Sequence, residues 1–507
     1  MLQRHYALSP RSHLEASQGA RRLRCDHPLL SIALNESAWH LLAALRPGLP
    51  LDRVATGVTA QTVDFLDELV LRGALQADYR LQPARELPPV DVVLPAYGNA
   101  DALQRCLAAL AQQSYPRERL RVTVVDDATP QPVQARVAAP AGLTLRWLRL
   151  AENRGPASAR NAGAFTDWPD GTPHAPWLAF LDSDCVPAPH WLAGLAALLE
   201  DPFVAAVGGG VRGLSRAGLL ARYEDACSSL SLGPLPGPVG LPQGALAYLP
   251  SCNLAIDRDV YERSGGFREG WRFGEDVDLS WRLRAAGHRL FYHPTPALAH
   301  EHRTRWVPFL QRRRAYGRSE AALHRAHPGR IAPVLQPGPV ALLIGAGLAL
   351  WAGWGVTGAT VAGCALLGMA AAPALRALRA ERSEGGWPLR VLAVAGARRA
   401  AAHLLQQARR LNRQALLLWL PVLAVAPALM PLGVAVFAAG ALGEWLARRP
   451  ALGPGTFLVG YAGECLAYSL GRIEGLLVQT WRRAWLGAAQ PAAGATNDRK
   501  SRDRDRP

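Results

Sequence analysis

The stretch Trp177-Leu178-Ala179-Phe180-Leu181-Asp182-Ser183-Asp184 decides the fold class of this chain. Its apolar residues predict a buried β-strand, and the strand would deliver Asp182 and Asp184 to its carboxyl end. That edge of a sheet is where α/β proteins bind ligands, and hard divalent cations prefer oxygen ligands such as carboxylates. An Asp-x-Asp tripeptide alone is weak evidence, because such tripeptides are common in surface turns. Its weight comes from the segments around it.

Strand-like and helix-like segments alternate on the amino-terminal side of this stretch. Residues 90–95 and 122–125 are mostly apolar and valine-rich, as in buried strands, whereas residues 103–113 and 156–165 predict helices. Such alternation predicts an α/β domain with a parallel sheet and helices on both faces, here over residues 90–330. Asp126 and Asp127 follow the second strand, so we expect them at the same sheet edge as Asp182 and Asp184.

A smaller unit precedes this domain. Asn35 and Thr59 are suited to cap two helices with apolar residues at helical spacing, and short strand-like segments flank these helices. The pattern is winged-helix-like over residues 20–82, and a proline-rich linker follows at 83–89. Residues 1–19 are expected to be flexible.

Long uncharged stretches follow the α/β domain. Residues 331–375 and 414–443 contain no charged side chain, and a membrane-spanning helix needs roughly 20 apolar residues. The first stretch is long enough for two spans. Residues 454–471 are a marginal third candidate, and an interfacial helix is the alternative there. The sequence therefore predicts a small α-helical membrane region over residues 331–488.

Arginines set the expected orientation of these helices. They concentrate in a loop at 376–413 between the apolar stretches and in the tail at 489–507, which is expected to be disordered. Because arginine-rich loops stay cytoplasmic, the α/β domain should lie on that side, which implies an even number of spans, most simply four. We expect a multi-pass protein of the inner (plasma) membrane, with membrane lipid as a partner.

The net charge of +16 does not indicate nucleic acid. The helix around residues 62–69 carries Asp64, Asp67 and Glu68, where a DNA-binding domain would carry a basic recognition helix. A membrane-tethered DNA-binding protein and an inactive scaffold are the non-enzyme alternatives. The seven cysteines are scattered and odd in number, so neither a disulfide framework nor a zinc knuckle is expected.

Six ordered motifs between Val90 and His302 resemble those of family-2 glycosyltransferases with the GT-A nucleotide-sugar-binding fold. The motifs occupy Val92–Tyr97, Val125–Ala128, Asn153–Asn161, Leu181–Asp184, Ser251–Asn253 and Phe273–Asp276. The resemblance implies a nucleotide-sugar donor and a divalent metal, Mn²⁺ or Mg²⁺. It implies that Asp184 binds the metal directly, and that Asp182 contacts the ribose or reaches the metal through water.

By the same resemblance, His300 corresponds to a histidine that the family carries near the end of the domain, and it would complete the set of metal ligands. The alternatives are that His302 does so, or that both histidines only cap a strand. By the same resemblance, Pro95 and Tyr97 frame the uracil ring and Asp127 accepts a hydrogen bond from it. An aspartate at a strand end also caps turns, and that interpretation of Asp127 stays open.

Arg160 would reach the nucleotide or its phosphates, because a guanidinium pairs well with phosphate oxygens; a solvent-facing helical arginine is the alternative. Asp276 is the expected catalytic base of an inverting displacement, and Glu275 would orient the acceptor, near Cys252 and Asn253. Acidic residues also favour the first turn of a helix. Asp276 is therefore interpreted both as the catalytic base and as a residue that stabilises the start of a helix.

The basic stretch Gln311-Arg312-Arg313-Arg314-Ala315 lacks the tryptophan that processive polysaccharide synthases carry in a Gln-x-x-Arg-Trp motif. Arg313 or Arg314 would approach the pyrophosphate, or the stretch is a basic patch at the membrane surface.

The amino-terminal unit resembles peptide-recognition modules, which bind a precursor peptide as an added strand, and a generic docking domain is the alternative. Together the parts resemble the glycosyltransferases of mycofactocin biosynthesis. This implies transfer of glucose from UDP-glucose to a peptide-derived redox cofactor. A lipid or surface polysaccharide is the alternative acceptor.

Overall fold

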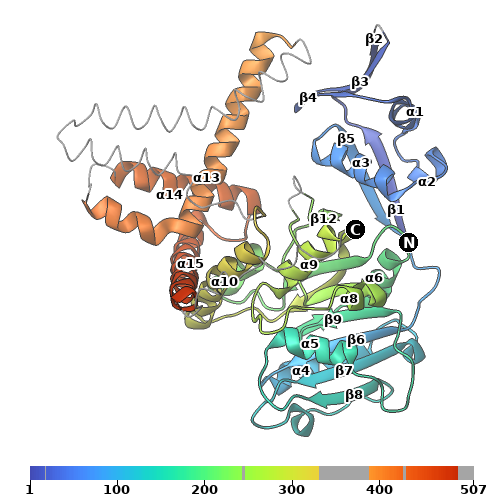
Figure 1. Cartoon of the computed structure of the whole chain (residues 1–507), viewed down its shortest axis with the longest axis vertical. Helices are drawn as coiled ribbons and strands as arrows, with labels where there is room; N and C mark the ends of the chain where they lie inside the picture. The colour runs from blue at the N-terminus through green and yellow to red at the C-terminus, as the bar shows by residue number, and fades with distance from the viewer. Residues whose placement is uncertain (18, 242–245, 331–386, 426–429, 489–507) are drawn as a thin grey trace, which may run out of the picture.

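The computed structural model describes residues 1–17, 19–241, 246–330, 387–425 and 430–488. It contains a small amino-terminal module, a central α/β domain and a group of carboxy-terminal helices (Figure 1). The α/β domain lies between the other two parts in the chain and carries most of the predicted site residues.

The central sheet is mixed. Its order among the described residues is β10-β14-β11-β13-β9-β6-β7-β8, with β12 paired to β14. The strands are β6 (Val90–Ala96), β7 (Leu120–Asp126), β8 (Thr144–Arg149), β9 (Trp177–Leu181), β10 (Cys185–Pro187), β11 (Ala206–Gly213), β12 (Gly237–Val239), β13 (Asn253–Asp257) and β14 (Leu290–His300).

Strands β6, β7, β8 and β9 are parallel, as predicted, but the prediction of a parallel sheet is wrong for β13, which runs antiparallel to both β9 and β11. An apolar run buried on both faces does not record its direction, so the sequence pattern could not reveal this reversal. The register pairs Asn253 with Leu181. The start of β13 therefore lies at the same edge as the end of β9.

Helices cover both faces of the sheet, as predicted. On one face, α4 (Ala100–Ala111) contacts β10, and α6 (Trp191–Leu199) contacts β11, β13 and β14. Leu103, Leu107 and Leu195 of these helices are buried in the core. The other face is covered by α5 (Pro156–Phe165), α8 (Arg258–Arg263) and α9 (Glu275–Ala285), which pack around Phe180 and Tyr261. Helix α7 (Leu219–Cys227) lies between β11 and β12 in the chain, and two short 3-10 turns, Arg117–Arg119 and Val133–Arg136, flank β7.

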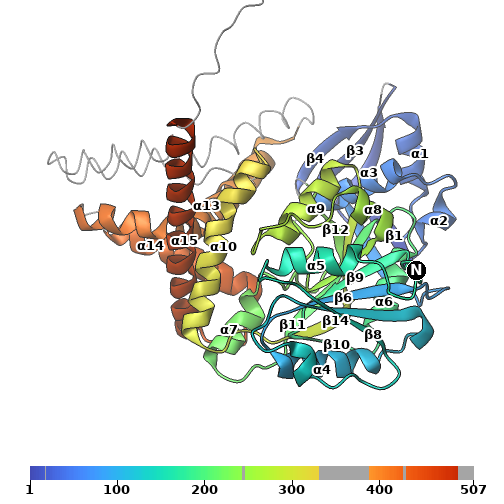
Figure 2. The same cartoon turned by 60° about the horizontal axis from the view of Figure 1, so that its bottom comes forward.

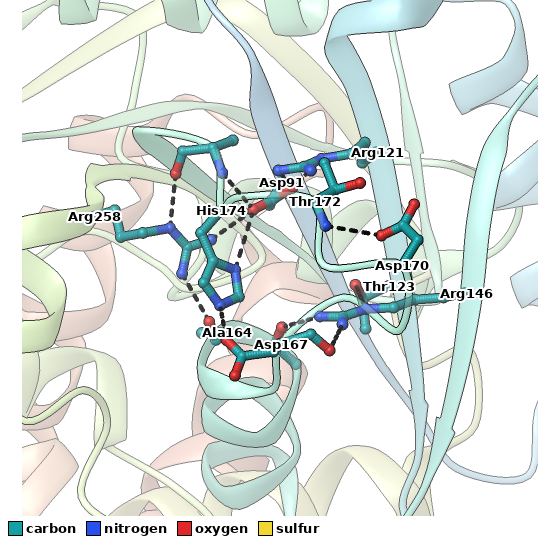
Figure 3. A network of polar contacts seen from close by, with 12 residues as sticks. Asp91, Arg121, Thr123, Arg146, Ala164, Asp167, Asp170, Thr172, His174 and Arg258 are labelled. Carbon is teal, nitrogen blue, oxygen red and sulfur yellow. Dashed lines mark hydrogen bonds and ion pairs between the residues drawn. The ribbon is translucent and has the colours of Figure 1, made fainter.

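A buried polar network fixes the amino end of β6 (Figure 3). The Asp91 carboxylate accepts hydrogen bonds from Arg121 Nε at 2.8 Å, Ala175 N at 2.9 Å and an Arg258 guanidinium nitrogen at 2.7 Å. Arg258 also donates to the carbonyl of Ala164, at the end of α5. The network ties β6, β7, α5 and α8 together at the sheet edge opposite the predicted site, and its role is structural.

The amino-terminal module begins earlier than the sequence predicted. Strand β1 (Leu2–Leu8) pairs with β5 (Leu75–Leu81), and a second sheet contains β2 (Ser12–Ser17), β3 (Ala20–Asp26) and β4 (Leu29–Ala33). The expectation that residues 1–19 are flexible is therefore wrong for the residues in β1 and β2. Tyr6 explains why, because its buried hydroxyl donates to Asp67 at 2.6 Å.

The three module helices are α1 (Glu36–Ala44), α2 (Leu51–Val54) and α3 (Ala60–Leu71). The predicted caps are confirmed: Asn35 accepts a hydrogen bond from Ala38 N, and Thr59 accepts one from Thr62 N. On α3, Asp64 and Asp67 form ion pairs with Arg289 of the α/β domain. These two acidic side chains of α3 bind an arginine of the same protein, and an acidic helix counts against the DNA-binding alternative.

The carboxy-terminal helices are α10 (Trp306–Ala326), α13 (Leu389–Val425), α14 (Met430–Arg448) and α15 (Pro454–Ala488). Helices α10 and α15 lie side by side (Figure 2). They approach so closely that a Cβ on Gly471 would stand 1.8 Å from the carbonyl oxygen of Arg314, and one on Gly317 would stand 2.1 Å from that of Tyr468.

The predicted membrane region is only partly described. Residues 331–375 and the tail at 489–507 lie outside the described residues. Within the described helices, none is both long and apolar enough to cross a membrane. The expected loop at 376–413 is helical from Leu389 onward, because its alanine, leucine and arginine residues are strong helix formers.

Candidate active site

A single cavity at the carboxyl edge of the sheet gathers nearly all the predicted site residues. They come from the ends of β6, β7 and β9, from α5, from the start of α9 and from the end of β14. Its lining includes Pro95, Tyr97, Asp127, Arg160, Asp182, Asp184, Cys252, Glu275, Asp276, His300 and His302.

The carboxylate of Asp184 and the imidazole of His300 approach each other in this cavity. Asp184 Oδ1 lies 3.4 Å from His300 Nε2, because antiparallel pairing of β10 with β14 sets Cys185 opposite His300. Ligand atoms of Asp184, Cys185 and His300 all lie within 4.8 Å of one another. A carboxylate with an imidazole is a donor set that fits Mn²⁺, while the buried Cys185 thiol, whose pKa burial raises strongly, is protonated.

His302 lies behind His300. Their Nδ1 atoms are 3.1 Å apart, and burial, together with the charge of His300, lowers the pKa of His302 to about 4. His302 also lines the cavity. Of the two histidines, however, it is His300 whose imidazole lies beside the Asp184 carboxylate. The geometry therefore favours His300 as the metal ligand.

Arg160 joins two carboxylates of the site. Its guanidinium donates to Asp182 Oδ1 at 2.5 Å and to Glu275 Oε1 at 3.0 Å. It is only 2% exposed, so the alternative of a solvent-facing arginine is wrong. Two of its donors already bind protein carboxylates, which makes Arg160 a positioning residue for Asp182 and Glu275 as well as part of the cavity wall.

Asp127 anchors the backbone that opens α5. Its two carboxylate oxygens accept hydrogen bonds from Arg154 N at 2.7 Å and Gly155 N at 2.8 Å. These contacts are not to the turn that follows β7, where Thr129 N donates to Asp126 instead. Asp127 lines the cavity, and the predicted base contact stays a prediction. Tyr97, 57% exposed, and Pro95 line the cavity nearby.

Asp276 opens α9 beside Glu275 and faces the cavity. Val277 N donates to its Oδ1 at 2.8 Å and Ser251 N to its Oδ2 at 3.4 Å. Burial, followed by the charge of Glu275, raises the pKa of Asp276 to about 7, against the opposing effect of Arg160. A carboxylate that titrates near neutrality is suited to accept a proton from an acceptor hydroxyl.

The acceptor role predicted for Asn253 is wrong. Its side chain is fully buried, where its Nδ2 donates to the carbonyl oxygens of Gly210 and Pro296 and its Oδ1 accepts a hydrogen bond from Trp191 Nε1. Asn253 is the first residue of β13, and its side chain points into the core. Cys252, the preceding residue, does line the cavity.

Helix α10 supplies cavity residues that sequence reasoning missed or misassigned. Arg312 and Tyr316 line the cavity. Arg314, which was expected near the pyrophosphate, is half exposed and pairs with Glu474 of α15 instead. Arg313 also reaches the cavity wall, but it pairs with Glu224 of α7 at 2.5 Å. Successive residues of a helix point in different directions, so the position of each arginine around the helix axis decides which one faces the site. A run of consecutive arginines does not indicate these directions.

The cavity thus combines paired aspartates at the carboxyl ends of parallel strands, a carboxylate–imidazole pair and a third carboxylate. This arrangement fits the GT-A fold class. Residues 88–318 match the family model described as "Glycosyltransferase like family 2". The chain therefore carries a family-2 glycosyltransferase domain over these residues.

Known relatives agree with this assignment. Over 250 residues, 49% of this chain and 50% of the relative, the sequence is 38% identical to the pre-mycofactocin glycosyltransferase of Mycobacterium tuberculosis. It is 30% identical to glycosyltransferase AglE of Haloferax volcanii over 41% of this chain and 64% of that protein. The chain spans about half the length of the mycobacterial relative it matches.

Among solved structures, the mannosyltransferase PcManGT from Pyrobaculum calidifontis, in complex with GDP-Man and Mn²⁺, superposes with a TM-score of 0.44 at 18% identity. The superposition covers 82% of this chain and 94% of that protein.

Proposed function

We propose that this protein is an inverting, metal-dependent hexosyltransferase that moves glucose from UDP-glucose to a peptide-derived redox cofactor, as in mycofactocin biosynthesis. The observation that carries the proposal is one cavity in which Asp276, with a pKa of about 7, shares the lining with Asp184 and His300. The acceptor assignment is supported by the 38% identity to a pre-mycofactocin glycosyltransferase and by the amino-terminal module.

In this proposal Asp184 and His300 hold Mn²⁺ or Mg²⁺, with Asp182 at the ribose or at a metal-bound water. The ion, when bound, neutralises the charge that develops on the leaving diphosphate. Pro95 and Tyr97 flank the base, and Asp127 keeps the Arg154–Gly155 backbone in place beside it. Arg160 holds the carboxylates of Asp182 and Glu275 at fixed positions in the cavity.

Asp276 performs the proton transfer. The acceptor hydroxyl gives its proton to the Asp276 carboxylate while its oxygen bonds to the anomeric carbon, and the nucleoside diphosphate leaves from the opposite face of the sugar. A positioned base contributes roughly 10²–10⁴-fold to such a rate. Because the base acts on the acceptor directly, one displacement occurs and the anomeric configuration inverts.

We also propose that the protein is located at the membrane, with the α/β domain on the cytoplasmic side. One observation favours a lipid or surface polysaccharide as a second candidate acceptor. An apolar groove outside the cavity contains Leu219, Trp306 and Val459, which are 53%, 42% and 61% exposed. Exposed apolar side chains grouped in this way are suited to contact a membrane.

The test is product analysis with UDP-glucose, Mn²⁺ and the cofactor stripped of its sugars. We expect a mass increase of one hexose, and an anomeric proton in the NMR spectrum whose configuration is opposite to that of the donor. Transfer to a lipid extract but not to the cofactor would support the second candidate. Retention of configuration would contradict the assignment of Asp276 as a base in a single displacement.

A further inference from the structure

Two aromatic side chains form part of the cavity wall next to the proposed base. Phe273, which precedes α9, and Tyr316, on α10, are half-buried and both line the cavity. Their ring centroids are 5.7 Å apart in an edge-to-face arrangement of 79°. Many of the other lining residues are charged or carry hydroxyl groups. The pair therefore adds an aromatic surface to a largely polar wall.

The positions of the two rings are fixed by the elements that carry them. Phe273 is separated from Asp276 only by Gly274 and Glu275, and Gly274 adopts a left-handed conformation with φ of 79°. A Cβ at Gly274 would lie 3.1 Å from Leu323 Cδ1 of α10. This glycine lets the start of α9 approach α10, which brings Phe273, Tyr316 and Asp276 into one part of the cavity.

Arg312 links this pair to the donor side. Its guanidinium lies 5.4 Å from the centre of the Phe273 ring. Burial acts to lower the pKa of Arg312, but the nearby Tyr316, Asp184 and Asp182 raise it. The donor residues Pro95, Tyr97 and Asp127 come from other elements, the ends of β6 and β7. The aromatic pair therefore belongs to the acceptor half of the cavity.

We propose that Phe273 and Tyr316 form an acceptor platform, on which a six-membered ring stacks while its hydroxyl points to Asp276. This inference rests on the proposed glycosyl transfer and narrows its acceptor to molecules that carry such a ring, either aromatic or pyranose. Aromatic side chains bind rings through their faces and edges. A flexible acyl chain would instead suit the separate apolar groove at Leu219, Trp306 and Val459.

The simpler role of the pair is to pack α9 against α10, and kinetics separate the two roles. In Phe273→Leu and Tyr316→Leu we expect the acceptor KM to rise about three- to tenfold, the range for loss of one aromatic contact. The rise in donor KM should be smaller. Tyr316→Phe keeps the ring and should recover most of the acceptor affinity.

Phe165→Leu is the matched control. Phe165 is 43% exposed and stacks on Tyr261 with centroids 5.5 Å apart, in α5 away from the cavity lining. It should leave the acceptor KM unchanged. Equal increases in donor and acceptor KM in the Phe273 and Tyr316 variants, or no increase, would overturn the platform and leave the packing role.

A binding experiment tests the platform without turnover. Saturation-transfer NMR with phenyl β-D-glucopyranoside, in the presence of UDP and Mn²⁺, should show saturation of the ligand. The apparent Kd from a saturation titration should rise about three- to tenfold in Phe273→Leu and stay unchanged in Phe165→Leu. Strongest saturation of the phenyl protons indicates an aromatic acceptor, and strongest saturation of the pyranose protons indicates a sugar acceptor. An apparent Kd in Phe273→Leu equal to that of the wild-type protein would contradict the platform. Saturation with the expected rise in Kd, but no transfer to any acceptor by the wild-type protein, would contradict the proposed function only.

Discussion

Arg160→Met should separate the positioning of the site from its chemistry. Arg160 is 2% exposed, and its guanidinium bridges Asp182 and Glu275. Methionine has a similar length but no charge, so the substitution leaves two carboxylates without their cation next to Asp276. Glu275 is itself only 7% exposed. Water can do little to solvate the charge that is left there.

The expected loss of stability is large. Removing one partner of a buried ion pair costs about 3–5 kcal/mol, mainly because an uncompensated charge stays buried. For a domain of about 150–250 residues, each kcal/mol shifts the melting temperature by about 2–4 °C, so a decrease of roughly 6–20 °C is expected. Arg160 also opposes the rise in the pKa of Asp276. Its loss should therefore move the acidic limb of the pH–rate profile to higher pH.

Thermal unfolding and the pH dependence of kcat/KM are the assays. Adding Glu275→Gln to Arg160→Met removes one unpaired charge and should restore part of the stability. Arg154→Met is the surface control, because the Arg154–Glu269 pair is about half exposed on both sides, and such pairs contribute about 0–1 kcal/mol. If Arg160→Met unfolds like Arg154→Met, the buried bridge does not hold the site together.

Three further outcomes are expected. The pKa of Asp276 lies above its ordinary value, so the folded state holds this proton more tightly and stability falls as pH rises from about 4 to about 7. By calorimetry, Asp276→Asn should therefore be more stable than wild type at pH 8, by about 1 kcal/mol or more. At pH 4 the difference in stability between the two proteins should be smaller. His300→Ala should raise the Mn²⁺ concentration needed for half-maximal activity about 10- to 100-fold, and His302→Ala should raise it less. Gly471→Ala should destabilise the chain by about 1–3 kcal/mol through overpacking against α10, and Gly453→Ala, which meets nothing within 4 Å, should not.

Local pattern was sufficient for part of this fold. The run ending in Asp182 and Asp184 predicted a buried strand and its edge, because hydrophobicity and strand ends are recorded in adjacent residues. Asn35 and Thr59 were correctly assigned as helix caps for the same reason. Each of these features depends on residues within one turn or one strand.

Features set by distant contacts were missed. Strand β1 forms only by pairing with β5, more than sixty residues away, so residues 1–19 looked unstructured. The antiparallel direction of β13 depends on its neighbours β9 and β11. His300 was reached by resemblance alone, since its approach to Asp184 requires β10 and β14 to pair.

Side-chain direction was the other limit. Asn253 and Cys252 are adjacent, yet only Cys252 lines the cavity and Asn253 is fully buried in hydrogen bonds to the core. Among the consecutive arginines of α10, Arg312 faces the site and Arg314 faces α15. One residue along a strand or helix reverses or rotates the side chain, and the sequence motif does not record this phase.

The most direct test of the central claim is nucleotide release from UDP-glucose by the full chain with Mn²⁺, measured with and without the deglycosylated cofactor. Asp276→Asn should be compared with Asp101→Asn, a substitution at an exposed carboxylate in the first turn of α4. We predict release that depends on the acceptor, that falls at least about 10²-fold in Asp276→Asn and that persists in Asp101→Asn. Undiminished acceptor-dependent release by Asp276→Asn would contradict the account.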